Sequence, residues 1–75
     1  MSYEKKRYAG AEREARDWNV SVAVGSQVSV QLDDGSVLET KTRSEAWVLG
    51  GHTAVVLLDG VTGGYLLSRV RPATR

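Results

Sequence analysis

Basic side chains at a spacing of two residues are the most promising chemical feature of this chain. They occur in two stretches typical of strands, VLETKTR and SRVRP, and they are Lys41, Arg43, Arg69 and Arg71. Alternate residues of a strand project from the same face, so each pair shares one face. If the two strands share a surface, the four charges form a patch suited to phosphates or to an acidic protein. The alternative is a solvated strand face, because Glu39 and Glu45 lie close in sequence and dilute the charge.

Two aromatic residues extend this candidate surface. Trp47 follows Arg43 by four positions, and it is either a core residue or an exposed residue that anchors a partner. Tyr65 can play the same part from a neighbouring strand. The predicted partner-binding residues are therefore Lys41, Arg43, Trp47, Tyr65, Arg69 and Arg71.

Residue types used in catalysis are present, but they do not form a recognisable group. His52 is the only histidine, and one imidazole without a second ligand or a positioned nucleophile is more typical of a turn than of a catalyst. Ser44 and Glu45 lie nearby, yet their spacing alone gives no triad geometry. Three aspartates are equally well explained as turn residues and follow no EF-hand pattern: Asp33, Asp34 and Asp59. We predict no catalytic, metal-binding or cofactor-binding residue and no enzymatic activity.

The glycine-rich stretch GVTGG, residues 60–64, is a candidate phosphate loop. A Walker loop continues into Lys-Ser or Lys-Thr at the start of a helix, and a dinucleotide fingerprint needs GxGxxG between a strand and a helix. Neither context surrounds this stretch. Because glycine permits sharp bends and bulges in small barrels, a turn is predicted here.

Composition limits the classes of protein to which the chain can belong. Its 75 residues contain no cysteine and one histidine, which excludes a disulfide framework and a zinc–thiolate site. Close packing or self-association must stabilise so short a chain, so a homo-oligomer is one expectation. Ten basic and nine acidic residues leave a net charge of +1, which favours a protein partner over nucleic acid. No segment approaches the length of a membrane span, and we expect a cytoplasmic protein without a membrane partner.

The secondary structure that must position these residues is predicted to change from helix to strand near Trp18. Residues 1–19 are rich in Glu, Lys, Arg and Ala, and they predict a helical arm. One face of this helix holds Tyr8, Ala11, Ala15 and Trp18, at spacings of three, four and three. This face docks either on the chain's own barrel or on a partner on which the arm folds.

Residues 20–75 change to a period of two, which is typical of half-buried strands. Alternating valines predict one strand over residues 20–24 and another over residues 28–32. The sequence DDGS predicts a hairpin with a type I′ turn. The apolar run HTAVVLLDG predicts a central strand that is covered on both faces. We expect these strands to enclose an interior lined by Val28, Val30, Val55 and Leu57.

The order of these elements resembles the SH3-like small barrels, which include KOW, Tudor and Sm-like modules and the plasmid-borne trimethoprim-resistant dihydrofolate reductases. The stretches GSQVSVQLDDGS and GGYLLSRVRP carry the resemblance, which spans about residues 25–72. It implies a mainly β fold, an antiparallel barrel of about five strands with a short N-terminal helix and a 3₁₀ turn at residues 66–68. The reductases have Val-Gln-Ile-Tyr where residues 63–66 read Gly-Gly-Tyr-Leu, so their activity is not implied.

These observations together predict a non-enzymatic interaction module that binds a protein partner. Small cysteine-free domains of this kind are common among phage and mobile-element accessory proteins. The alternative is a small barrel that binds nucleic acid through its basic strand face, in the manner of KOW or Sm-like modules.

Overall fold

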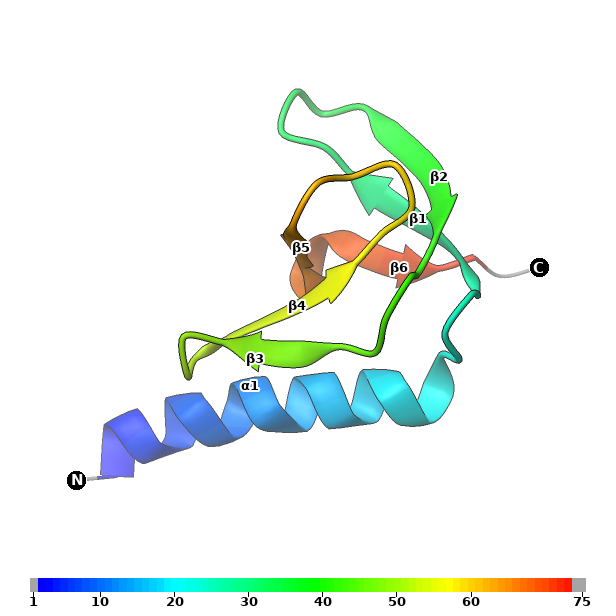
Figure 1. The fold of residues 1–75 in the computed structure, drawn as a ribbon. Coiled ribbons are helices and arrows are strands. Elements are labelled where there is room, and N and C mark those ends of the chain that lie inside the picture. The colour runs from blue at the N-terminus through cyan, green and yellow to red at the C-terminus, as the bar shows by residue number, and fades with distance from the viewer. Residues whose placement is uncertain (1, 74–75) are drawn as a thin grey trace.

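Within the described part of the chain, a long helix is followed by six short strands (Figure 1). The computed structural model describes residues 2–73, with side chains from residue 10 onward. The elements in chain order are α1 (Ser2–Ser21), β1 (Gln27–Gln31), β2 (Val37–Lys41), β3 (Trp47–Leu49), β4 (Thr53–Leu57), β5 (Gly64–Leu66), the 3₁₀ helix η1 (Leu67–Arg69) and β6 (Val70–Pro72). The prediction of a mainly β fold with an N-terminal helix is confirmed.

Helix α1 packs its alanine face against the strands. Ala11 and Ala15 are buried and Trp18 is half-buried against the core, which confirms the predicted helical face at these positions. Tyr8 lies outside the described side chains. Because alanine is small, the helix can approach β3 and β4 closely, and Figure 1 shows it running alongside β3. No helix of the described residues has the length and apolarity needed to cross a membrane.

The end of α1 differs from the predicted strand over residues 20–24. The helix continues to Ser21, and the Val22 amide donates to the Trp18 carbonyl oxygen at 2.7 Å. Val22 is buried because it lies four residues after Trp18, on the same side of the helix. Burial on the helical face outweighs the β propensity of valine, and the strand prediction for this segment is wrong.

Asn19 anchors the last turn of α1 to the chain entering β3. Its Nδ2 donates to the Ala46 carbonyl oxygen at 3.0 Å, and its Oδ1 accepts from the Ala46 amide at 2.8 Å. The side-chain amide thereby satisfies both backbone groups of Ala46, as a neighbouring strand would do. This pair of bonds fixes where the helix lies relative to the second sheet.

Two three-stranded antiparallel sheets follow the helix, with strand orders β2–β1–β6 and β3–β4–β5. They meet where the chain passes from β2 to β3, and there Thr42 forms an isolated antiparallel bridge with Leu58. The buried Thr42 hydroxyl accepts from the Gly25 amide at 2.9 Å. A closed barrel needs an unbroken ladder of strand pairs, and within residues 2–73 no ladder joins β5 to β6. The sheets therefore do not form a closed barrel, and the SH3-like barrel is not confirmed.

The two sheets and the helix share one core, which is made mainly of valine. Its most central side chains are Val28, Val30, Val56, Leu58, Leu67 and Val70. The predicted contribution of β1 is confirmed. Val55 is buried as predicted, but it lies on the other side of β4 from this core cluster, and Leu57 is only half-buried. An apolar run that is covered on both faces has no period-two alternation, so its sequence does not indicate which face is inside.

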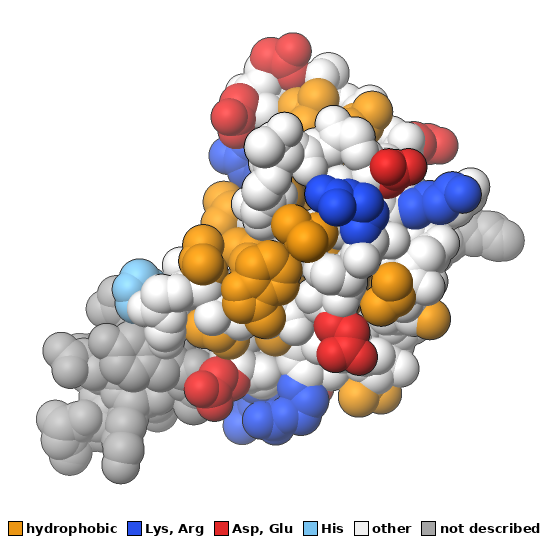
Figure 2. Space-filling view, viewed as in Figure 1, with side chains coloured by type: hydrophobic (Ala, Val, Ile, Leu, Met, Phe, Trp, Pro, Cys, Tyr) orange, Lys and Arg blue, Asp and Glu red, His pale blue; other side chains and the backbone are white. Residues whose placement is uncertain are grey.

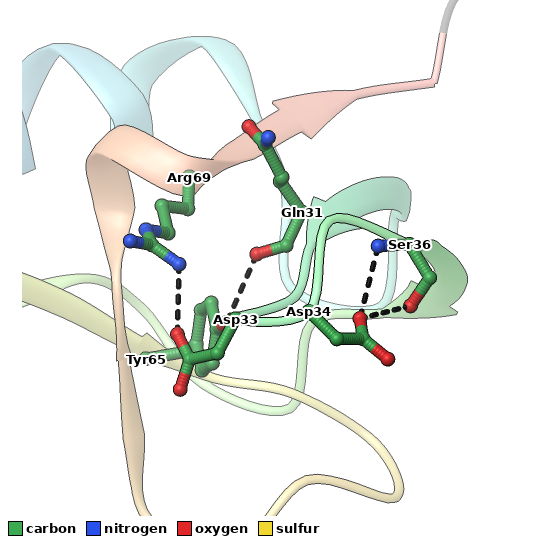
Figure 3. A network of polar contacts seen from close by, with 6 residues as sticks. All are labelled: Gln31, Asp33, Asp34, Ser36, Tyr65 and Arg69. Atoms are coloured by element: carbon green, nitrogen blue, oxygen red, sulfur yellow. Dashed lines mark hydrogen bonds and ion pairs between the residues drawn. The ribbon is translucent and has the colours of Figure 1, made fainter.

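The β1–β2 hairpin turns with a geometry that differs from the predicted type I′ turn. The Gly35 amide donates to the Leu32 carbonyl oxygen at 3.0 Å, and Gly35 has φ +89°, while no described non-glycine residue has positive φ. A type I′ turn needs positive φ at both central residues, so the turn type is wrong although the hairpin is confirmed. Asp34 Oδ1 accepts from the Ser36 hydroxyl at 2.6 Å and from its amide at 2.9 Å, which lowers the pKa of Asp34 (Figure 3).

Candidate functional site

The segment of residues 41–49 carries β2 into β3 and alternates between exposed and covered side chains. Its odd-numbered residues are exposed, and its even-numbered residues are buried or half-buried. Because alternate residues of an extended chain project to opposite sides, one side of the segment holds Lys41, Arg43, Glu45, Trp47 and Leu49. This side changes from charged to apolar as it enters the second sheet.

Trp47 lies on the outer face of the β3–β4–β5 sheet and covers its central strand. It pairs with Val55 of β4, which pairs in turn with Leu66 of β5. Val55 is only 2% exposed, although it lies outside the core cluster. A Cβ built on Gly64 would lie 3.3 Å from Trp47 Cη2 and 3.0 Å from Val55 Cγ2. The missing side chain of Gly64 therefore leaves the space in which the indole ring rests against the sheet.

Three exposed apolar side chains surround Val55 on this outer face. Trp47 is 38% exposed, Leu49 is 53% exposed and Leu66 is 43% exposed. These residues together with Val55 are named the Trp47 face, and Figure 2 shows apolar side chains gathered over the second sheet on the side toward the viewer. Single exposed apolar residues are ordinary on protein surfaces, whereas a contiguous group is typical of an interaction site.

Arg43 borders the Trp47 face at the loop that joins β4 to β5. Its Nε donates to the Leu58 carbonyl oxygen at 2.9 Å, and its Nη2 donates to the Val61 carbonyl oxygen at 3.4 Å. Its backbone amide donates to the Leu57 carbonyl oxygen at 2.8 Å. These bonds hold the guanidinium in one position without neutralising it, because among the described side chains of residues 10–73 no carboxylate forms an ion pair with Arg43.

Two of the other predicted basic residues lie on the first sheet. Lys41 and Arg71 are exposed on the outer side of the β2–β1–β6 sheet. Glu39 shares that side, because Glu39 and Arg71 both pair with Ser29, one from each neighbouring strand. Arg43 follows Lys41 on the same side of residues 41–49, but Glu39 lies beside Lys41 and Arg71, and Arg69 forms an ion pair with Asp33. The predicted basic patch therefore includes acidic groups.

Arg69 and Tyr65 hold the β1–β2 hairpin against the chain that follows β4 (Figure 3). Arg69 Nη1 forms an ion pair with Asp33 Oδ1 at 2.8 Å, and the Tyr65 hydroxyl donates to the Gln31 carbonyl oxygen at 2.9 Å. Tyr65 is half-buried and packs on the core, on the side of the sheet opposite Trp47. Both side chains connect segments that are distant in sequence, which is a structural role.

The residues considered for catalysis are engaged with the backbone or with neighbours. The Ser44 hydroxyl donates to the Glu45 carbonyl oxygen at 2.9 Å and accepts from the Leu57 amide at 3.2 Å. His52 is exposed, and its Nδ1 lies 3.4 Å from the Thr53 hydroxyl. Among the residues that the structure describes, no group of three histidine, aspartate or glutamate side chains is placed to hold a metal ion. These contacts arrange the turns around β4 and do not assemble a nucleophile with a base.

The candidate functional site is therefore the Trp47 face, together with Arg43 at its border. No protein-family model, curated protein or solved structure matches this chain. Sequence-based reasoning included Trp47 and Arg43 but missed Leu49 and Leu66, and extending the period-two pattern from Arg43 through Trp47 would have found Leu49.

Proposed function

We propose that this chain is a non-enzymatic interaction module that binds a protein partner through the Trp47 face. The observation that carries the proposal is the joint exposure of Trp47, Leu49 and Leu66 on one sheet face, above the buried Val55. Covering these side chains removes apolar surface from water, which is the main driving force of protein association. Tryptophan is also enriched among the residues that dominate binding energy at protein interfaces.

The proposal includes membership of the SH3-like class of small β folds. In its support, β1 is flanked by β2 and β6, and the 3₁₀ helix η1 directly precedes the last strand. The Thr42–Leu58 bridge and the bond from the Arg43 amide to the Leu57 carbonyl oxygen connect the two sheets along one side. In folds of this class, interaction sites lie on the outer strands and loops while the interior is filled by side chains.

The test of the protein-binding proposal is affinity capture from a lysate of the source cells with wild type, Trp47→Ser and Val37→Ser. Val37 is 64% exposed on the other sheet, so it is a matched control for loss of an exposed apolar side chain. We expect one partner to be retained by wild type and Val37→Ser and lost by Trp47→Ser, with circular dichroism showing that all three fold. Capture of the same proteins by all three forms contradicts the proposal.

Nucleic-acid binding is a second candidate, supported by a groove of about 230 Å³ on the first sheet. Its lining includes Arg69, Arg71, Ser29 and Ser68, whose guanidinium and hydroxyl groups suit phosphate oxygens. The ion pair of Arg69 with Asp33 reduces the charge available there. Titration with single- and double-stranded DNA and RNA should then show salt-dependent binding that Arg71→Ala weakens, and no binding at low salt eliminates this candidate.

A further inference from the structure

Two aspartates of this chain directly precede a glycine, Asp34 before Gly35 and Asp59 before Gly60. An Asp–Gly bond is open to a reaction that needs no enzyme and no cofactor. The glycine nitrogen attacks the carbon of the aspartate carboxyl group, and a bond between them closes a five-membered succinimide ring. The carboxyl oxygen leaves with the amide proton as water. Glycine favours the attack because it has no Cβ to crowd the nitrogen or to restrict the backbone.

Hydrolysis of the ring completes the reaction. Water adds to one of the two ring carbonyl carbons and breaks its bond to the glycine nitrogen. Opening at the side-chain carbonyl restores aspartate, whereas opening at the main-chain carbonyl gives isoaspartate, in which the chain runs through the former side chain. The water lost is regained, so the two products have the same mass and no oxidant or reductant is consumed. In isoaspartate the main chain is one methylene longer.

At Asp34 both reacting groups are held by hydrogen bonds. Its Oδ1 accepts from the Ser36 hydroxyl at 2.6 Å and from the Ser36 amide at 2.9 Å, as Figure 3 shows. The attacking nitrogen belongs to the Gly35 amide, which donates to the Leu32 carbonyl oxygen at 3.0 Å. Ring closure must break all three bonds. The bonds to Ser36 also lower the pKa of Asp34, and an ionised carboxylate is a poorer electrophile than the neutral acid.

Asp59 is exposed like Asp34, but its reacting groups are free. Among the described residues, neither its carboxylate nor the Gly60 amide forms a hydrogen bond or ion pair. The contacts of Asp59 are made by its main chain, whose amide donates to the Lys41 carbonyl oxygen at 2.9 Å and whose carbonyl oxygen accepts from the Thr40 hydroxyl at 2.7 Å. Only the Thr40 bond lies on the peptide group that must rotate for ring closure.

We propose that Asp59 is a site of spontaneous isoaspartate formation in the folded chain, and that Asp34 is protected from the same reaction. Three hydrogen bonds oppose ring closure at Asp34, against one at Asp59. This difference should slow the reaction at Asp34 by about tenfold or more. The modification is independent of the proposed function, because it needs no partner.

Isoaspartate at position 59 changes the place where the two sheets meet. The added methylene displaces the carbonyl oxygen that accepts from Thr40, so a contact between β2 and the end of β4 is lost. It also lengthens the loop whose Val61 carbonyl oxygen accepts from Arg43. The modification therefore alters the border of the Trp47 face.

The experiment is incubation of the full chain at body temperature and neutral pH for several weeks, in buffer and in parallel in guanidinium chloride. Trypsin cuts after Lys and Arg, so it places Asp34 on peptide 17–41 and Asp59 on peptide 44–69. Chromatography separates isoaspartyl from aspartyl peptides of equal mass, and electron-transfer fragmentation locates the residue. In buffer, isoaspartate should accumulate at position 59 about tenfold faster than at position 34. In guanidinium chloride the two rates should be similar, because both dipeptides then lack their hydrogen bonds.

Two variants serve as controls, with circular dichroism showing that each one folds. Ser36→Ala removes the hydroxyl bond, so it should accelerate the reaction at position 34 by roughly threefold or more and leave position 59 unchanged. Asp59→Glu should abolish the isomer of peptide 44–69, because glutamate would have to close a six-membered ring, which forms more slowly. Asp59 is the only aspartate on that peptide, and no asparagine accompanies it.

Equal rates at the two positions in buffer overturn the proposal, as does a faster reaction at position 34. Isoaspartate that forms at position 59 in guanidinium chloride but not in buffer also overturns it, because the main-chain bonds to β2 then protect Asp59. A Ser36→Ala chain that reacts no faster at position 34 contradicts the protection of Asp34 by Ser36.

Discussion

The outer faces of the two sheets have opposite chemistry, although both follow the same alternation of side chains. The β2–β1–β6 sheet presents mainly amides, hydroxyls and charges on its outer face, at Gln27, Ser29, Gln31, Glu39, Lys41 and Arg71, with Val37 as an exposed apolar exception. The β3–β4–β5 sheet presents Trp47, Leu49 and Leu66. An antiparallel sheet with one face in water is normally polar on that face, as the first sheet is. The second sheet is therefore the one whose outer face is apolar, and the chain changes between the two patterns as it crosses residues 41–49.

The largest expected effect is on the free energy of unfolding. It shows whether the two sheets, whose outer faces differ, unfold as one cooperative unit. Leu58 is fully buried and forms the bridge with Thr42 where the sheets meet. Leu58→Ala should lower the free energy of unfolding by about 2–5 kcal/mol, because it leaves a cavity in the shared core. Urea unfolding followed by tryptophan fluorescence and by circular dichroism should give one coincident transition. Two separate transitions would show that each sheet has its own stability.

The next largest effect is on the stability of the contact between α1 and the second sheet, where Asn19 anchors the helix. Asn19→Ala removes both bonds to Ala46 and leaves part-buried backbone groups without their partner, at a cost of about 1–3 kcal/mol. Hydrogen exchange should accelerate at the β3 amides more than at the β1 amides. Asn19→Asp keeps an acceptor for the Ala46 amide and should have a smaller effect. Equal acceleration in both sheets would contradict this role for Asn19.

A matched pair of substitutions tests the two outer faces directly. Leu49 and Val37 are both more than half exposed, at 53% and 64%, but they lie on different sheets. Leu49→Ser and Val37→Ser should each change the free energy of unfolding by no more than about 0.5 kcal/mol, because little buried surface is lost. Only Leu49→Ser should weaken binding of a protein partner, by about threefold to tenfold. Equal losses of association in both variants would mean that the faces do not differ in function.

The smallest expected effect is a change in the pKa of Asp34, in the hairpin turn of the first sheet. The Ser36 hydroxyl and amide stabilise the ionised Asp34 carboxylate, so its pKa in the folded chain lies below the ordinary value of 3.8. A lowered carboxyl pKa contributes stability above its unfolded pKa, and this contribution is lost as the pH falls through the folded pKa. Ser36→Ala removes the hydroxyl donor, and NMR titration should show the Asp34 pKa rising toward 3.8. An unchanged Asp34 pKa would show that the hydroxyl bond has no effect.

Local patterns were sufficient to predict most of the elements. The spacing of Ala11, Ala15 and Trp18 predicted the buried helical face, and alternation predicted Val28 and Val30 in the core. The Asp-Gly pair predicted the hairpin, although not its turn type. These predictions succeed because helical and strand periodicities decide which side chains share a face before any distant contact forms.

Long-range contacts decided what the local patterns left open. The run TAVVL is apolar at every position except Thr53, so only the packing of Trp47 over Gly64 shows that Val55 lies outside and Val56 inside. The pairing of Arg69 with Asp33, 36 residues apart, removed one charge from the predicted basic patch. The sequence by itself determined the helix face, the first hairpin and the alternation through residues 41–49, because these depend on neighbours along the chain. Only the tertiary structure decided which apolar residues remain uncovered, because that depends on the side chains that the other sheet and the helix place against each face.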